Sequence, residues 1–346
     1  MRLDTFTYVL PDERIAQSPL EPRDSARLLH ISPATGLMSH LVFRDIEQLL
    51  RPDDLLVINE TRVSAVRLIG CGLGGGYREA LVLSPHLPSG LGCYEALVRP
   101  GKAARIGDSL VFSDSGLACR VEAILTDGIR VLRFDGDPVH VANCLDKHGR
   151  VPLPPYIHGV LTDKERYQTV YSRMPGSAAA PTAGLHFTHP LLQRIQAGGT
   201  DIAKIVLTVG LGTFRPIKCV DDVTKHPMHA EYVDIPQETV NKVNHCRGRV
   251  IAVGTTSLRA LETAARIAPS TERITAFSGP TNIFIYPGQT IKSVDGLITN
   301  FHQPGSTLLL LVATILGIEG MQKAYQTALQ DEYRFLSFGD AMLILS

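Results

Sequence analysis

The sequence has no excess of charge, since 34 lysines and arginines balance 34 aspartates and glutamates over 346 residues. It therefore lacks the overall basic footprint that is typical of nucleic-acid-binding proteins, so any such partner would have to bind a local patch. Cysteines are also few. Six stand at positions 71, 93, 119, 144, 219 and 246, with no Cys-x-x-Cys pair and no structural zinc spacing. We interpret them as scattered reduced thiols and predict no metal.

Long hydrophobic runs are absent as well. The longest, residues 308–316, is shorter than the about 20 residues that a membrane-spanning helix needs. The first residues, MRLDTFT, lack the apolar core of a signal peptide. No internal repeat or low-complexity segment is visible. We therefore predict a cytoplasmic protein without a membrane segment.

The order of expected elements predicts an α/β domain with an inserted antiparallel β-barrel. Residues 55–58 form a continuous apolar run, typical of a strand buried on both faces. Six short strands then follow, at 65–69, 79–83, 93–98, 109–112, 118–124 and 129–134, separated by glycine turns. A barrel or a sandwich would fit this spacing. After the proline-rich segment 152–156, strands alternate with helices near 191–196, 238–246, 257–267 and 308–316. We expect a discontinuous domain of residues 1–65 and 152–346, interrupted by a barrel at 66–151.

Four polar turns crowd into the second half of the chain, several of them beside short apolar runs of strand character. They read PTAGLHFT at 181–188, HPMHAE at 226–231, GTTSLR at 254–259 and TNFHQPGST at 299–307. Open α/β folds place binding and catalytic groups in turns at strand ends. Histidine, carboxylate, arginine and hydroxyl side chains gathered there indicate acid/base chemistry on a polar substrate.

Two of these turns allow alternative interpretations. An apolar strand, Gly254 and three hydroxyl residues precede a helical pattern, so the helix N-terminus could bind an anion, or a hydroxyl could merely cap the helix. His229 and Glu231 share a face if their segment is extended, which suits an acid/base pair; a polar strand without catalytic function is the alternative. Proline at 227 argues against a helical two-histidine metal site.

The remaining candidates are single side chains. His186 and His302 could be structural rather than catalytic. Arg62 and Arg259 could bind a carboxylate or phosphate, or belong to internal ion pairs. The glycine-rich loop at 72–76 runs from strand to strand, so a hairpin is favoured over a phosphate-binding loop.

Taken together, segments along nearly the whole chain resemble the S-adenosylmethionine:tRNA ribosyltransferase-isomerase family of queuosine biosynthesis. The matching segments are IAQ at 15–17, PRD at 22–24, VINETR at 57–62, LVRPGK at 97–102, PLPPYI at 152–157, ERYQTVY at 165–171, APTAGLHFT at 180–188, VGLGTFRP at 209–216, MHAE at 228–231, AVGTTS at 252–257, IFIYPG at 283–288, LITNFH at 297–302 and YRFLSFGDAM at 333–342. Their number, length and order make the resemblance highly specific.

The resemblance implies transfer of the ribosyl part of S-adenosylmethionine to the aminomethyl group of a 7-deazaguanine base in tRNA. The product would be epoxyqueuosine, with adenine and methionine released. S-adenosylmethionine is then a consumed substrate rather than a cofactor, tRNA is the partner, and we expect a monomer. The residues predicted to act in catalysis are His186, His229, Glu231 and His302. Substrate binding is predicted for Asn59, Arg62, Thr182, Ala183, Gly184, Gly254, Thr255, Thr256, Ser257, Arg259 and Asn300.

The inserted domain offers a candidate tRNA contact. Arg99, Lys102 and Arg105 lie on one expected loop and could meet phosphates, although a solvated basic loop is the alternative. The chain departs from the family pattern at Glu60 and Asn282, where the family usually has Asp, and at Gly305, where many members have Lys. A binding module without chemistry would favour Arg, Lys and aromatic residues over gathered histidines and carboxylates. A metal hydrolase would need three ligands, which the sequence does not supply.

Overall fold

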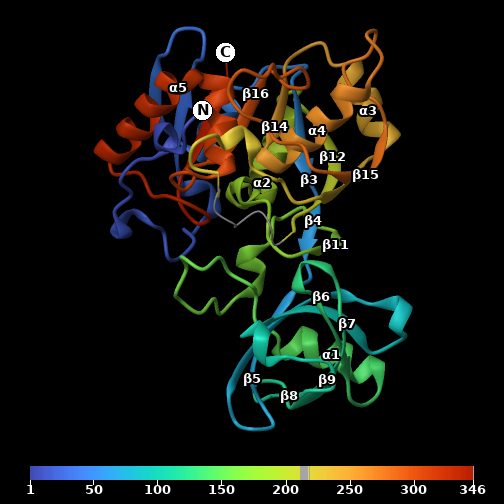
Figure 1. The fold of residues 1–346 in the computed structure, drawn as a ribbon. Coiled ribbons are helices and arrows are strands. Elements are labelled where there is room, and N and C mark those ends of the chain that lie inside the picture. The colour runs from blue at the N-terminus through green and yellow to red at the C-terminus, as the bar shows by residue number, and fades with distance from the viewer. Residues whose placement is uncertain (211–216, 218, 346) are drawn as a thin grey trace. The chain divides into compact units, whose positions relative to one another are not determined.

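The computed structural model describes residues 1–210, 217 and 219–345 (Figure 1). Its residues form two compact units. One comprises Met1–Thr61, Pro154–Met174 and Ala180–Ser346, and the other comprises Arg62–Leu153 and Pro175–Ala179. The α/β fold with an inserted antiparallel β-barrel is confirmed. The domain limits at 66 and 152 stay a prediction, close to the places where the chain passes between the units.

The first unit contains a nine-stranded mixed sheet. Its order is β15 (Phe277–Thr281), β13 (Glu231–Ile235), β12 (Asp201–Thr208), β3 (Leu55–Asn59), β14 (Val250–Val253), β16 (Gly296–Asn300), β17 (Ala341–Leu345), β1 (Arg27–Ile31) and β2 (Met38–Val42). β12, β3, β14 and β16 run parallel to one another. Their carboxyl ends therefore meet at one edge, which we call the carboxyl edge.

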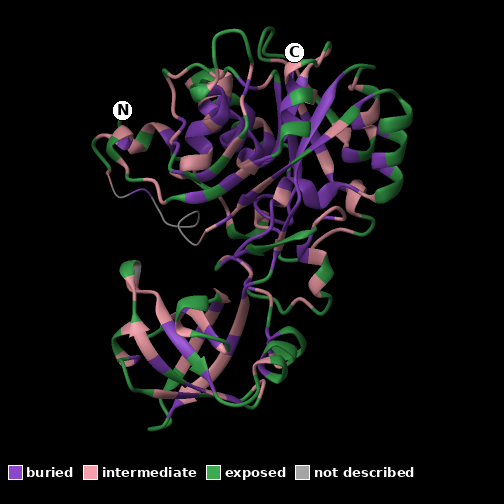
Figure 2. Ribbon diagram, turned by 90° about the vertical axis from the view of Figure 1, so that its right-hand side faces the viewer, coloured by how far each residue is buried: buried purple, intermediate pink, exposed green. Residues whose placement is uncertain are grey.

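The helices of this unit are α2 (His189–Ala197), α3 (Gln237–Asn244), α4 (Thr255–Ile267) and α5 (Thr307–Gln330). All five residues of β3 are buried, and so are all five of β16 and of β17 (Figure 2). Burial on both faces explains the continuous apolar run at 55–58. The hydrophobic core includes Leu56, Ile58 and Ile251 from the strands and Leu191 and Ile195 from α2. A 3-10 helix, Phe43–Gln48, follows β2.

The long helix α5 passes a test for a membrane span by length and composition alone. The apolar run recognised in the sequence is only its first part. Gly317 has a φ of 73° and a ψ of 164°, so it breaks the helix into two segments, each shorter than about 20 residues. Leu309, Leu310 and Leu311 are buried in the protein interior. The helix is therefore weak evidence for a membrane span.

The second unit is a closed barrel, and this resolves the alternative of a sandwich. The strand order is β10 (Arg130–Phe134), β7 (Cys93–Arg99), β6 (Tyr77–Pro85), β5 (Val66–Gly72), β8 (Ser109–Phe112) and β9 (Leu117–Ile124). Inward positions alternate along the strands, as with Ala80 and Val82 or Cys119 and Val121. The sequence did not indicate the helix α1 (Pro138–His148), which places Val141 and Leu145 against this core. A separate two-stranded sheet pairs β4 (Thr61–Val63) with β11 (Met174–Ser177).

Candidate active site

Asn300, the last residue of β16, connects two of the predicted turns at the carboxyl edge. Its Oδ1 accepts a hydrogen bond from Thr182 Oγ1 at 3.0 Å, and its Nδ2 donates to the carbonyl of Leu336 at 3.2 Å. The same Nδ2 lies 3.2 Å from Nε2 of His186. These partners orient the amide, because its oxygen faces a hydroxyl donor and its nitrogen faces a carbonyl. The fold therefore brings the predicted residues Thr182, His186 and Asn300 together.

The contact with Asn300 decides the tautomer of His186. Since the amide nitrogen can only donate, Nε2 of the imidazole accepts, and the ring proton sits on Nδ1. Nδ1 has no hydrogen-bond partner among the residues that the structure describes. Burial, with Arg334 and Arg23 nearby, lowers the pKa of His186 to about 3. His186 is therefore a neutral hydrogen-bond donor at neutral pH and a weak base.

His302 follows β16 and is equally enclosed. Its backbone N–H donates to Tyr325 Oη at 2.9 Å, its carbonyl accepts from the Tyr8 hydroxyl, and its Nε2 lies 2.8 Å from Thr299 Oγ1. Burial lowers the pKa of His302 to about 3. Two of the four predicted catalytic residues are thus neutral and poorly basic in the absence of substrate.

Acid should destabilise the protein through these two histidines. Their pKa is about 3 when folded and near 6.5 as free side chains, so their stabilising contribution is complete above pH 6.5 and is lost as the pH falls toward 3. Each should cost about 1.4 kcal/mol of unfolding free energy per pH unit within that window. Urea denaturation at pH 7.5 and 5.0 measures this loss, and His302→Gln should reduce it. An equal loss in the variant and the wild type would contradict the assignment.

Glu231 begins β13 at the same edge and forms a buried ion pair with Arg259 of α4, from Oε2 to Nη1. Both side chains are about 5% exposed or less. Glu231 Oε1 accepts the backbone N–H of Gly210 at 3.3 Å, and Arg259 Nε donates to the carbonyl of Ile283 at 3.3 Å. The alternative of an internal ion pair for Arg259 thus has structural support, and Glu231 has a structural role that its sequence pattern did not indicate.

His229 lies just before this strand. β13 starts at Glu231, so His229 lies outside the paired strand. His229 is half-buried, whereas His186 and His302 are buried.

The turn after β14 lies beside the turn that holds His186. Gly254 has a φ of 90° and caps α4, and a Cβ added to it would lie 3.8 Å from Cβ of Ala183. No side chain caps the helix: Ser257 Oγ instead donates to the carbonyl of Val253 at 2.7 Å. Thr255 is buried, and the Oγ1 atom of Thr256 is buried without a hydrogen-bond partner in the described structure. The backbone amides of this helix start are therefore not satisfied by a side-chain cap.

Gly184 is required by close packing rather than by its backbone angles. A Cβ at this position would lie 2.0 Å from Tyr171 Oη and 2.8 Å from Thr169 Cγ2. The Tyr171 hydroxyl is buried and makes no hydrogen bond within the part of the chain described here.

Gly184→Ala should therefore destabilise the protein by about 1–3 kcal/mol, because the new methyl group overpacks the site. Adding Tyr171→Phe should recover part of this loss, since it removes the closest atom. Denaturant midpoints of the single and double variants measure both effects. Equal stability of the single and double variants would contradict this account.

Other predicted residues lie elsewhere. Asn59 is fully buried, accepts the amides of Thr61 and Leu207, and donates to the Leu207 carbonyl, so its side chain links β3 to β12. Arg62 belongs to the barrel unit. Glu60, one of the departures from the family pattern, pairs with Arg173 at 2.7 Å. Residues 211–216, within the matching segment VGLGTFRP, lie outside the described residues.

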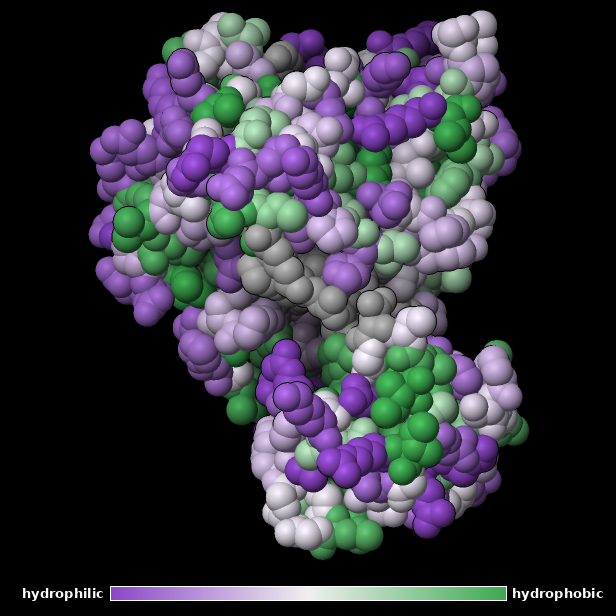
Figure 3. Space-filling model, viewed as in Figure 1, coloured by the Kyte–Doolittle hydropathy of each residue, from purple (hydrophilic) through white to green (hydrophobic). Residues whose placement is uncertain are grey.

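Arg99, Lys102 and Arg105 are exposed on the barrel unit around the short helix Gly101–Ala103, which follows β7. The visible face of this unit mixes hydrophilic and hydrophobic side chains (Figure 3). Within the described residues, no group of three His, Cys, Asp or Glu side chains could hold a metal ion.

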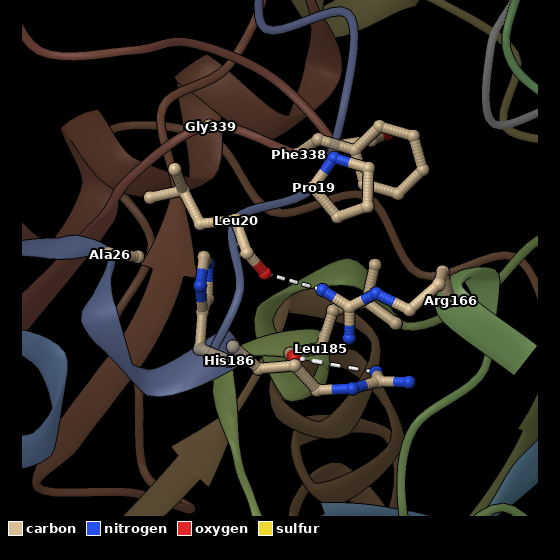
Figure 4. A pocket seen from close by; sticks show the side chains of 10 residues that line it. Pro19, Leu20, Ala26, Arg166, Leu185, His186, Phe338 and Gly339 are labelled. Atoms are coloured by element: carbon tan, nitrogen blue, oxygen red, sulfur yellow. Dashed lines mark hydrogen bonds between the residues drawn. The ribbon is translucent and has the colours of Figure 1, made fainter. Parts of the chain in front are cut away.

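A pocket in the first unit brings the predicted residue His186 together with residues that the sequence analysis did not select. Arg23, Arg166, His186 and Phe338 line it, and Figure 4 shows Arg166, His186 and Phe338 around the cavity. Each comes from a segment already quoted for its family resemblance. The only indication of these residues in the sequence was an arginine in each of the matching segments PRD and ERYQTVY. Sequence spacing does not predict that segments so far apart in the chain line one pocket.

Comparison with known proteins identifies the family of the chain. The family model described as "Queuosine biosynthesis protein" matches residues 3–344. The chain belongs to the queuosine biosynthesis protein family. Proteins named S-adenosylmethionine:tRNA ribosyltransferase-isomerase, from Desulfitobacterium hafniense and Symbiobacterium thermophilum, are 48% and 50% identical, each over the whole of both chains.

A crystal structure of an S-adenosylmethionine tRNA ribosyltransferase from Thermotoga maritima is similar to this queuosine biosynthesis family member. It is 35% identical, with a TM-score of 0.56, over 99% of this chain and all of that one. The resemblance stated from the sequence segments is thereby confirmed.

Proposed function

We propose that the protein transfers and isomerises the ribosyl moiety of S-adenosylmethionine onto 7-aminomethyl-7-deazaguanine at the wobble position of tRNA. Epoxyqueuosine would form, with release of adenine and methionine. The full-length identity to proteins named for this activity supports the proposal. The structural observation that carries it is the convergence of Thr182, His186, Gly254 and Asn300 at the carboxyl edge. We further propose that the enzyme acts as a cytoplasmic monomer.

The reaction sets requirements that the site can be compared with. A base removes a proton from C5′, which the sulfonium acidifies; adenine leaves after protonation; the neutral amine attacks; and methionine leaves as a thioether. The neutral state of His186 and His302 makes them unsuited to proton transfer near neutral pH. This favours His229 as the proton-transfer residue. Glu231, two residues later in the chain, is fixed in place by its ion pair with Arg259.

The start of α4 is the proposed contact for S-adenosylmethionine. Uncapped amides after Gly254 and the unpaired Thr256 hydroxyl are suitable donors for its carboxylate or ribose oxygens. Ala183 lies against the same turn, so the two segments could contact one ligand.

Incubation with labelled S-adenosylmethionine and precursor tRNA tests the proposal. Release of adenine together with labelled tRNA supports the transferase. Binding of both substrates without adenine release would instead indicate a binding module without chemistry.

Binding of tRNA should depend strongly on salt although the net charge of the chain is zero. Arg99, Lys102 and Arg105 are exposed, so their charges are available to phosphates. Changing all three to glutamine should weaken tRNA binding and reduce the slope of log K against log salt by as much as about 3, or about 1 per lost contact. Filter binding at salt concentrations between 50 and 200 mM measures the slope, because affinity that depends on phosphate contacts falls steeply over this range. An unchanged slope would place the tRNA patch elsewhere.

A further inference from the structure

The pocket beside His186 combines apolar walls with cationic side chains. Leu20, Leu185 and Phe338 supply apolar surface, while Arg23, Arg166 and His186 supply donors, and the lining contains no acidic residue (Figure 4). All of these residues belong to the first compact unit.

The arginines of this region are held mainly by neutral partners. Arg23 donates to the carbonyls of Gln168 and Glu165 at 2.7 Å each, Arg166 to that of Leu20, and Arg334 to that of Ser18. A carbonyl orients a guanidinium but does not neutralise it. The side chain of Glu21, 3.3 Å from Arg166, is 76% exposed and therefore compensates only weakly. Asp340 accepts the backbone amide of Arg334 and offsets part of the charge there.

Several donors in this region remain unused. Nε and Nη1 of Arg166 and Nδ1 of His186 have no hydrogen-bond partner among the described residues. Nη1 of Arg334 is buried and unpaired in the same description. Burial and the neighbouring Arg166 lower the pKa of Arg23, so the cations are both desolvated and mutually repulsive. A negatively charged acceptor would relieve this arrangement.

We propose that this pocket binds an anionic oxygen group of a substrate, a carboxylate or a phosphate, through Arg166, Arg23 and the Nδ1–H of His186. The inference rests on the proposed function, which supplies two candidates for the anionic group. These are the carboxylate of S-adenosylmethionine and a backbone phosphate of tRNA. It assigns His186 a binding role, which its fixed tautomer supports.

Inorganic phosphate is a probe that needs no turnover. Titration at constant ionic strength, followed by the imidazole nitrogen resonances of His186, should show saturable binding in the wild type. Arg166→Gln should weaken it about tenfold or more, since it removes a charged hydrogen bond. Arg194→Gln is the matched control, because Arg194 pairs with Glu47 at the surface, away from the pocket lining. Absence of a phosphate-dependent shift in the wild type, or equal binding by Arg166→Gln, overturns the proposal.

Steady-state kinetics of the same variants identify the source. If the pocket binds the carboxylate of S-adenosylmethionine, Arg166→Gln should raise KM for S-adenosylmethionine about tenfold and leave KM for tRNA unchanged. If it binds a backbone phosphate of tRNA, the variant should have a raised KM for tRNA, and the slope of log K for tRNA against log salt should fall by about 1. Phosphate binding without either kinetic effect overturns the assignment to a substrate. A wild type that releases no adenine would refute the proposed function alone, because the phosphate titration does not depend on it.

Discussion

His229→Ala should reduce turnover by about 10²- to 10⁴-fold, the usual effect of removing a general acid or base. The pKa values of about 3 of His186 and His302 leave those two residues neutral throughout the working range of pH, so they cannot easily exchange a proton. His229 is half-buried and lies two residues before Glu231, which begins β13. Measured kcat should fall, while the affinity for S-adenosylmethionine and the denaturation midpoint should change little.

The decisive readout for His229 is exchange of the C5′ hydrogen with deuterated solvent, if that step is reversible. The variant should lose this exchange together with turnover. His245→Ala is a suitable control, because His245 is an exposed histidine at the end of α3. Near-wild-type turnover of His229→Ala would return the proton-transfer role to His186 or His302.

Breaking the Glu231–Arg259 pair should destabilise the protein by about 3–5 kcal/mol, since either single substitution leaves a charged group buried without its partner. Arg259→Met leaves the carboxylate of Glu231 buried without its partner. Glu231→Gln strands a guanidinium whose Nη2 already has no hydrogen-bond partner in the described structure. The sequence analysis predicted a catalytic role for Glu231 and no role in stability. The buried ion pair changes that expectation.

Urea denaturation of the single variants and of Glu231→Leu/Arg259→Met tests the pair. The double variant should be more stable than either single variant, because no unpaired charge remains. Strictly additive losses would show that the two residues do not stabilise each other. Glu231→Asp shortens the side chain while keeping its charge, so turnover lost there without a comparable loss of stability would indicate a catalytic role as well.

The sequence predicted the barrel well because its signals are local. Alternating side chains and glycine turns are short-range features, and they located six strands at spacings that the structure reproduces. Local signals failed where the structure departs from regular geometry. Gly317 interrupts α5. The apolar run before it predicted only the first part of the helix, and the part that continues to Gln330 was missed. Whether the six strands close into a barrel or split into a sandwich depends on pairings such as β10 with β7, which no local pattern shows.

The candidate site shows the same division. Segment matches identified the family and selected Thr182, His186, Gly254 and Asn300, which the structure brings together at the carboxyl edge. The segment matches did not show which of these side chains are free to contact a substrate and which are occupied by internal hydrogen bonds. Asn59 was selected as a substrate contact, but its amide is occupied between β3 and β12. Arg23 and Arg166 were not selected, although they line the pocket beside His186.

The sequence by itself determined the family, the α/β domain with its inserted barrel, and the turns that carry the candidate residues, because segment identity and hydrophobic periodicity are properties of neighbouring residues. Only the tertiary structure decided the protonation of His186 and His302, the pairing of Glu231 with Arg259, and the gathering of arginines from three distant segments. These depend on burial and on contacts between residues as far apart as His186 and Asn300, 114 positions along the chain. Desolvation and hydrogen bonding at a site arise only when the chain has folded around it.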